Sequence, residues 1–168
     1  PSDLHLFSMP YCYNFSAGLL MYKGLPFIPK TPSLPAQHAD SFLQHASQLV
    51  MYASNQQAGA VALTGLFLAY SWYVKKDKLS KKDIIQQLQN FTYTSNQPTR
   101  ISMQTPFLNI TIFDRFYLES LYGDFVYPDG TRPDMEHVIE LQKIYVEWFF
   151  KEIEVRGIAF TFPVITAS

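Results

Sequence analysis

Residues 133–166, PDMEHVIELQKIYVEWFFKEIEVRGIAFTFPVIT, predict a long amphipathic helix that leads directly into an apolar strand, and this pair of elements indicates the fold class. In the helical part, Pro133 to Val155, apolar side chains between Val138 and Phe149 form one stripe, and glutamates lie mostly on the other face. Gly157 ends this helix. The next segment, Ile158 to Thr166, is a near-continuous apolar strand of the kind that parallel sheets bury on both faces.

The rest of the chain repeats this alternation of strands and helices. A proline-rich segment from Pro26 to Pro35 reads as an extended connector, because proline every third residue cannot continue a helix. The order of strand, helices, strand, helix, strand indicates an α/β fold with parallel pairing. Three strands are too few to close a barrel, and this fits a fragment of a larger fold. The other expected strands are Leu4–Phe15 and Ile101–Phe113, and the other expected helices are Ala36–Ser54, Gly59–Val74, Ser80–Phe91 and Asp114–Leu121.

Composition limits the classes of function. The 168 residues are 48% hydrophobic and 16% charged, which suits one domain, or a large part of one, with a sizeable core. A net charge of −1 provides no basic field for nucleic acid or an anionic membrane. The longest apolar stretch, Ala58 to Val74, is at the lower limit of a membrane span, and we interpret it as a buried helix. Because the chain starts at Pro1 and not at Met, we expect it to begin within a longer protein.

Metal and phosphate sites have no signature in the sequence. The four histidines show no metal-ligand spacing, and the single cysteine excludes an internal disulfide and a four-cysteine zinc site. No glycine-rich loop of the phosphate-binding type occurs. The lysines between Lys75 and Lys82 are typical of a solvated charged corner. We therefore expect no metal in this chain.

Cys12 is the residue most suited to chemistry, near the end of the first expected strand in the segment PYCYNF, residues 10–15. No cationic residue is adjacent in sequence to favour a thiolate, so a cysteine hydrolase is not favoured. Two interpretations remain open from the residues alone. A buried cysteine is usually a small inert apolar side chain, but a neutral thiol among aromatic rings also suits hydrogen-atom chemistry.

Polar residues also occur inside expected strands. Gln104 and Asn109 lie within Ile101–Phe113, and Thr161 and Thr166 lie within the last strand. A central strand must satisfy such groups by hydrogen bonds or use them to line a cavity. The residues alone do not decide between these outcomes.

Three stretches together resemble the anaerobic (class III, glycyl-radical) ribonucleoside-triphosphate reductases. They are SDLHL leading to PYCYNF (2–6 and 10–15), QTPFLNIT (104–111) and TFPVIT (161–166). The resemblance implies the first half of a ten-stranded α/β barrel that consists of two five-stranded halves. Residues 1–168 would then be part of the catalytic domain of an enzyme that reduces ribonucleoside triphosphates to deoxyribonucleoside triphosphates for DNA replication.

The resemblance also implies roles for individual residues. Cys12 matches the first-strand cysteine that acts as a reducing thiol, and Asn14, Gln104 and Asn109 would face the substrate in the barrel interior. The helical region at about residues 36–91 matches the part that forms the dimer interface and binds the allosteric nucleotide effector. Its expected effector contacts are Gln44, Gln48 and Lys78.

The family's remaining components have no counterpart in these residues. The glycyl radical, the radical-initiating cysteine and a carboxy-terminal zinc site would all lie outside this fragment, which we expect to be inactive alone. The implied cofactors and partners are formate or a thiol reductant, ATP and deoxynucleotide effectors, a second copy of the chain and a radical-SAM activating enzyme, all in the cytoplasm. Two alternatives remain at this point: another glycyl-radical enzyme of the pyruvate formate-lyase type, and a non-catalytic interaction fragment.

Overall fold

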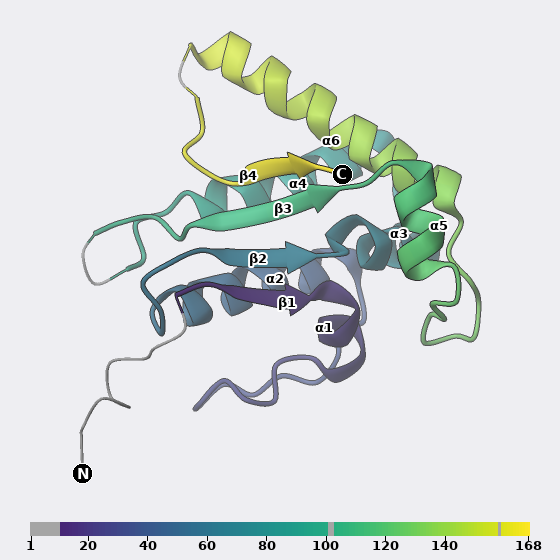
Figure 1. Cartoon of the computed structure of the whole chain (residues 1–168), viewed down its shortest axis with the longest axis horizontal. Coiled ribbons are helices and arrows are strands. Elements are labelled where there is room, and N and C mark those ends of the chain that lie inside the picture. Colours follow the sequence, from purple (N-terminus) through teal and green to yellow (C-terminus); the bar gives the residue numbers. More distant parts are fainter. Residues whose placement is uncertain (1–10, 101–102, 158) are drawn as a thin grey trace.

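The computed structural model describes residues 11–100, 103–157 and 159–168 and has an α/β architecture (Figure 1). Strands and helices follow one another along the chain, and the strands run in the same direction. This confirms the predicted fold class. The elements are β1 (Tyr13–Ser16), α1 (Ala17–Lys23), α2 (Ala39–Ser54), β2 (Val61–Thr64), α3 (Leu66–Asp77), α4 (Lys81–Ser95), β3 (Leu108–Ile112), α5 (Arg115–Tyr122), α6 (Met135–Arg156) and β4 (Val164–Ala167).

The four strands form one parallel sheet in the order β1-β2-β3-β4. Each strand pairs with the next strand in the sequence, and the helices between them make the crossovers that parallel pairing requires. The carboxyl ends of all four strands therefore meet at one edge of the sheet. In this arrangement β1 and β4 are the edge strands.

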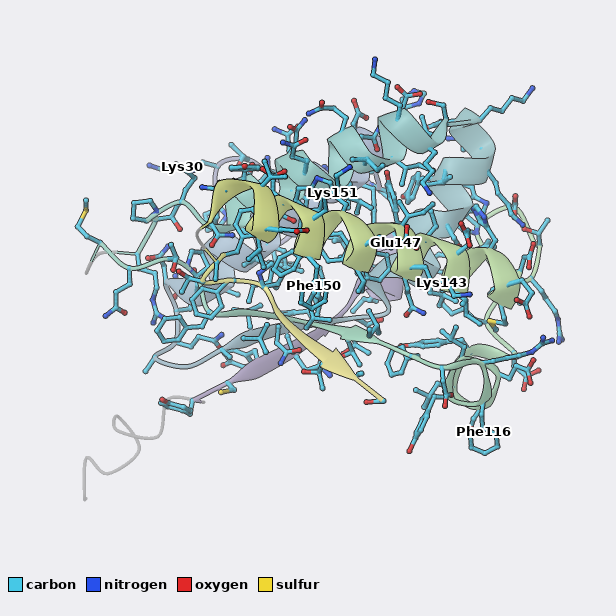
Figure 2. All side chains as sticks on the ribbon, turned by 90° about the horizontal axis from the view of Figure 1, so that it is seen from above. Lys30, Phe116, Lys143, Glu147, Phe150 and Lys151 are labelled. Atoms are coloured by element: carbon cyan, nitrogen blue, oxygen red, sulfur yellow. The ribbon has the colours of Figure 1, made fainter. Side chains whose placement is uncertain are left out.

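Helices cover one face of the sheet. In Figure 1, α2 and α4 lie behind the strands, and Figure 2 shows α4 and α6 together on one side of them. The alternating side chains Val61, Leu63, Leu108 and Ile110 point to this side and are fully buried in the core. No helix among the described residues has the length and apolar character needed to cross a membrane.

Capping residues in the sequence mark the start of α4, the start of α5 and the end of α6. Ser80 caps α4, accepting a hydrogen bond from the Asp83 backbone N–H, while the Asp83 carboxylate accepts one from Ser80 N–H. Asp114 caps α5 in the same way. Gly157 ends α6 with φ of 67°, a backbone conformation that favours glycine.

Buried tyrosines link the helices through their hydroxyl groups. Tyr127 Oη lies 2.7 Å from Ser71 Oγ in α3, and the Tyr73 hydroxyl donates to the Ala36 carbonyl oxygen. Burial raises the pKa of both Tyr73 and Tyr127 to about 12, so both remain neutral donors at physiological pH. These bonds satisfy polar groups that would otherwise be costly in the core.

One predicted element is partly wrong. The apolar run Gly59–Val74 contains β2 and then α3, where we expected a single helix. A short, fully buried strand and a buried helix have the same apolar appearance in a sequence. Gly65 separates the two elements at φ of 75°, a conformation that a continuous helix does not contain.

The other predicted strands are too long. β1 ends at Ser16 and starts only at Tyr13, and the rest of the predicted strand Leu4–Phe15 lies largely outside the described residues. β3 begins at Leu108, seven residues after the predicted start at Ile101. β4 covers only the end of the predicted last strand and is partly exposed, because it is at the sheet edge with no neighbour on one side.

The capping box of α4 provides a stability test. Ser80→Ala removes the side-chain oxygen that binds the Asp83 N–H, so we expect the free energy of unfolding to fall by about 1 kcal/mol. Urea denaturation followed by circular dichroism measures this change. Lys82→Ala, an exposed change in the same helical turn, serves as the control and should stay within about 0.5 kcal/mol. Equal losses in both variants would contradict the role of the cap.

Candidate active site

The sheet face opposite the helices is polar. Because successive side chains of a strand point to opposite sides, the residues that alternate with the core positions share this second face. We call it the open face, because no helix covers it in Figure 2. Its residues are Asn14, Ser16, Ala62, Thr64, Asn109, Thr111, Val164 and Thr166.

The register aligns two of the predicted substrate contacts. Asn14 pairs with Ala62, Ala62 pairs with Asn109, and Asn109 pairs with Val164, so these four residues form one row across the sheet. At the usual spacing of neighbouring strands, the backbones at Asn14 and Asn109 are about 10 Å apart. The small Ala62 side chain lies between the two amides.

Both amides are held by threonines of the neighbouring strand. The Thr64 hydroxyl donates to Asn14 Oδ1 at 2.6 Å. Asn109 contacts Thr166 Oγ1 through both side-chain atoms, at 3.0 Å from Nδ2 and 3.2 Å from Oδ1. These bonds orient the two amides while each keeps further hydrogen-bonding capacity for a ligand.

Cys12 lies immediately before β1, at the amino end of the sheet. It is two residues before Asn14 in the sequence. Its Sγ accepts a hydrogen bond of 3.3 Å from the backbone N–H of Ala60. The expectation of a buried thiol is wrong within the part of the chain that the structure describes, because Cys12 is exposed there.

Gln104 differs from the other predicted substrate contacts. It is exposed and precedes β3, whereas we expected it inside the strand. Its carbonyl oxygen accepts a hydrogen bond from the Arg100 backbone N–H, which closes a turn at the amino end of the sheet. The structure thus brings Asn14 and Asn109 to one face of the sheet, and it leaves Cys12 and Gln104 before their strands at the amino end of the sheet.

The predicted effector residues lie on the helical side. Gln44 and Gln48 are exposed one turn apart on α2. Gln44 lines a groove of about 440 Å³ between α2 and α4, and Gln48 is outside its lining. The other lining residues are Asp40, Leu43, Ser47, Gln87, Asn90, Phe91, Tyr93 and Thr94.

Lys78 terminates α3 in a left-handed conformation, with φ of 53°, and its side chain is exposed. The preceding residue, Asp77, ties this end of α3 to the start of α2. Its carboxylate accepts a hydrogen bond of 2.7 Å from the Ala39 backbone N–H and lies 3.1 Å from His38 Nδ1. The structure therefore brings Lys78 near the first turn of α2, although it does not line the groove that contains Gln44.

Within the described ranges, no group of three or more His, Cys, Asp or Glu side chains is arranged to hold a metal ion. On the open face, the described side chains provide two amides and several hydroxyl groups, and the Cys12 thiol lies at the amino end of the sheet.

Sequence reasoning missed the partners that hold these groups. Thr64 and Ala60 were assigned to a helix, so their contacts with Asn14 and Cys12 were not foreseen. The signal was present, because the segment Gly59–Gly65 has glycines at both ends of a short run that includes Val61 and Thr64. Short apolar runs between glycines favour a strand.

Comparison with known proteins places this geometry in a family. Residues 2–168 match the anaerobic ribonucleoside-triphosphate reductase family. A search of curated proteins gave no match.

Solved structures of the anaerobic ribonucleotide reductase from Thermotoga maritima are similar over nearly the whole chain. The complex with dATP and CTP is 40% identical, with a TM-score of 0.89 over 97% of this chain. The structure with dATP bound in the specificity site is 41% identical, with a TM-score of 0.90 over 98% of this chain. The structure with citrate in the active site is 41% identical, with a TM-score of 0.87 over 97% of this chain. This chain covers 29%, 29% and 30% of those three chains, respectively.

The structure is thus an α/β fold with a parallel sheet, two amides on one polar sheet face and a thiol at the amino end of the sheet. The chain belongs to the anaerobic ribonucleoside-triphosphate reductase family. This assignment decides against an enzyme of the pyruvate formate-lyase type. The chain spans less than a third of the length of the solved relatives.

His45, next to Gln44 on α2, makes stability depend on pH. Burial lowers the pKa of His45 below its usual 6.5. As the pH falls from about 7.5 to about 5.5, the unfolded chain therefore binds a proton more readily than the folded chain, and the free energy of unfolding decreases. His137, whose pKa burial also lowers, contributes in the same direction.

His45→Gln should make this pH-dependent loss smaller, and denaturant titrations at the two pH values measure the difference. Gln48→Ala, an exposed change on the same helix that removes no titratable group, is the control and should keep the parent's pH dependence. An unchanged pH dependence in His45→Gln would contradict the assignment.

Proposed function

We propose that this chain is part of an enzyme that reduces ribonucleoside triphosphates to deoxyribonucleoside triphosphates by anaerobic radical chemistry. The observation that supports this most directly is that Asn14 and Asn109 share the open face of the parallel sheet, with the exposed Cys12 two residues before Asn14 at the amino end of the sheet. Membership of the reductase family supports the type of reaction.

Cys12 would act as a reducing thiol. Removal of a ribose 2′-hydroxyl as water consumes two electrons and two protons, and one S–H bond supplies one of each. With formate as the reductant, its oxidation to carbon dioxide would supply both electrons and one proton, the second proton would come from solvent, and Cys12 would transfer its hydrogen and then recover it. With a second thiol as the reductant, Cys12 and that thiol would each supply one electron and one proton and would end as a disulfide. In the complete enzyme, the glycyl radical would generate the radical on the initiating cysteine, which would abstract the first hydrogen. An accessible thiol at the amino end of the sheet fits this role.

Asn14 and Asn109 would bind the ribonucleotide. Each amide is oriented by a threonine, so the cost of ordering these side chains does not arise when the substrate binds. Gln104, at the amino end of the sheet, would contact the substrate from the turn before β3. Because Ala62 has a short side chain, the sugar would lie above it between the two amides.

The helical region at about residues 36–91 would bind the nucleotide effector at an interface between two copies of the chain. One relative has dATP in its specificity site. In this chain, Gln44 and Gln48 would contact the effector through hydrogen bonds, and Lys78 would contact its phosphates as a point charge. The exposure of all three side chains supports this proposal.

The complete enzyme would need further components. We propose that it is a cytoplasmic homodimer, that ATP and deoxynucleotides regulate it, and that a radical-SAM enzyme generates its glycyl radical. A zinc site in the carboxy-terminal part would complete it. Residues 1–168 would then be a partial catalytic domain, inactive when separated from the remainder.

Replacement of the thiol tests the catalytic proposal. Cys12→Ala in the full-length, radical-activated enzyme should reduce CTP reduction by at least about 1,000-fold, because the reducing hydrogen is lost. CTP binding should persist, and anaerobic turnover together with equilibrium binding measures both properties. Lys151→Ala, on the solvent side of α6 (Figure 2), is the control and should retain activity. Undiminished turnover in Cys12→Ala would reject the proposal and support a non-catalytic role for this fragment.

The effector proposal is tested by binding of dATP. The double variant Gln44→Ala/Gln48→Ala should weaken binding to the full-length dimer by about tenfold, equivalent to about 1.4 kcal/mol of lost hydrogen bonding. Isothermal titration calorimetry measures this change. Gln86→Ala, an exposed glutamine of α4 that does not line the groove, should leave the dissociation constant unchanged. If both variants bind dATP like the parent, the effector does not contact α2 at these positions.

A further inference from the structure

The segment before β2, residues 57–60, contacts Cys12 directly. The Ala60 N–H donates to Cys12 Sγ at 3.3 Å, and the Ala60 carbonyl oxygen accepts from the Tyr13 N–H at 3.0 Å. Two consecutive residues of the Cys12 strand are therefore bound to the same residue of this segment. The N–H donor occupies one side of the sulfur atom and leaves the S–H hydrogen free to point elsewhere.

Gly59 leaves the space in which the thiol lies. A Cβ atom at this position would be 2.7 Å from Cys12 Sγ and 2.1 Å from the Tyr11 carbonyl oxygen. Both distances are far below van der Waals contact, so any side chain at residue 59 would displace the thiol or its backbone. Gly59 is itself buried.

Arg100 fixes this segment from the other side. Its Nη2 donates to the carbonyl oxygen of Gln57 at 2.6 Å and of Ala58 at 3.2 Å. The guanidinium lies over the Phe107 ring, with Cζ 4.9 Å from the ring centroid. A cation above an aromatic face is held electrostatically, and this restrains the guanidinium group.

The side chain of Gln57 joins the first and last residues of the 57–60 segment. Its side chain is buried, and Nε2 donates to the Ala60 carbonyl oxygen at 3.0 Å. The contacts thus run laterally across the amino ends of three neighbouring strands. They pass from Phe107 and Arg100 before β3, to residues 57–60 before β2, and to Cys12 before β1.

We propose that Arg100 is a positioning residue for Cys12, acting through the 57–60 segment. Arg100 touches neither the thiol nor the row of amides, and no role was expected for it from the sequence. The inference rests on the proposed function of Cys12 as a reducing thiol. The claim that Arg100 fixes the position of the Cys12 thiol is separate from the role of that thiol in catalysis.

The test combines turnover with thiol reactivity in the full-length enzyme. Arg100→Met keeps an apolar stem over Phe107 but removes both hydrogen bonds to the segment, so Cys12 loses its fixed position. We expect kcat for CTP reduction to fall by about 10- to 100-fold, the usual cost of a misplaced reacting group. KM for CTP should change less than about threefold, because Asn14 and Asn109 remain in place. Arg100→Lys, which keeps a cation that can reach a carbonyl oxygen, should recover part of the loss.

A second readout reports on the thiol itself. The rate of alkylation of Cys12 by iodoacetamide, followed by mass spectrometry of its peptide, should change at least about threefold in both Arg100→Met and Gly59→Ala. The matched control is Arg132→Met. Arg132 also donates to a backbone carbonyl oxygen, that of Gly123 at 3.3 Å, but it lies beyond the carboxyl end of β3. This control should match the parent in both measurements.

The outcomes separate this inference from the proposed function. If Cys12→Ala is inactive while Arg100→Met has the parent's kcat and alkylation rate, the positioning role is overturned and the thiol chemistry stands. If Cys12→Ala remains active, the proposed function fails, and the alkylation rate alone decides whether Arg100 positions the thiol. A fall in kcat in Arg100→Met with no change in alkylation would also overturn the inference, because it would indicate a general structural loss.

Discussion

The parallel register of the four strands determines which side chains of the sheet enter the core and which lie on the open face. It gives each strand one side chain toward the helices and the next toward the open face, so a slip of one residue would exchange the two sets. Val61, Leu63, Leu108 and Ile110 are fully buried on the helical side, which makes such a slip very unfavourable. The same register places Asn14 and Asn109 in one row, so the stability of the core and the geometry of the candidate site have one common cause.

The helical layer stabilises this register because it packs against the buried side of the sheet. Buried tyrosine hydroxyls connect α3 to the loop before α6 and to the segment before α2, and Asp77 binds the first turn of α2. These are directional contacts between elements far apart in the sequence, and they fix the helices relative to one another more specifically than apolar packing alone. The strands that carry Cys12 and its supporting segment therefore pack on a helical layer whose helices are joined by hydrogen bonds.

Much of this arrangement follows from the sequence by simple rules. The amphipathic pattern of α6, the Ser80 capping box and the terminal Gly157 were readable directly, because each depends on residues close together in the chain. β2 was not predicted, because its four residues were included in one long apolar run with α3, although the glycines on either side of it indicate a separate strand. Because β2 was not predicted, the contacts of Ala60 with Cys12 and of Thr64 with Asn14 were not expected. The roles of Arg100 and Gly59 also depend on contacts more than 40 residues apart, which no local pattern encodes.

The sheet order also has a consequence for handling the protein. Within the described residues, β1 and β4 each have one side without a strand partner, and the exposed Val164 belongs to the second of them. Such edges carry free backbone donors and acceptors in an extended conformation, which act as templates for another chain. Separated from the remainder of a reductase, these 168 residues would therefore tend to self-associate along the sheet edges, and their solubility would depend on protein concentration more than on core stability. A lysine on the outer side of β4 would be the natural protection, and the chain has none there.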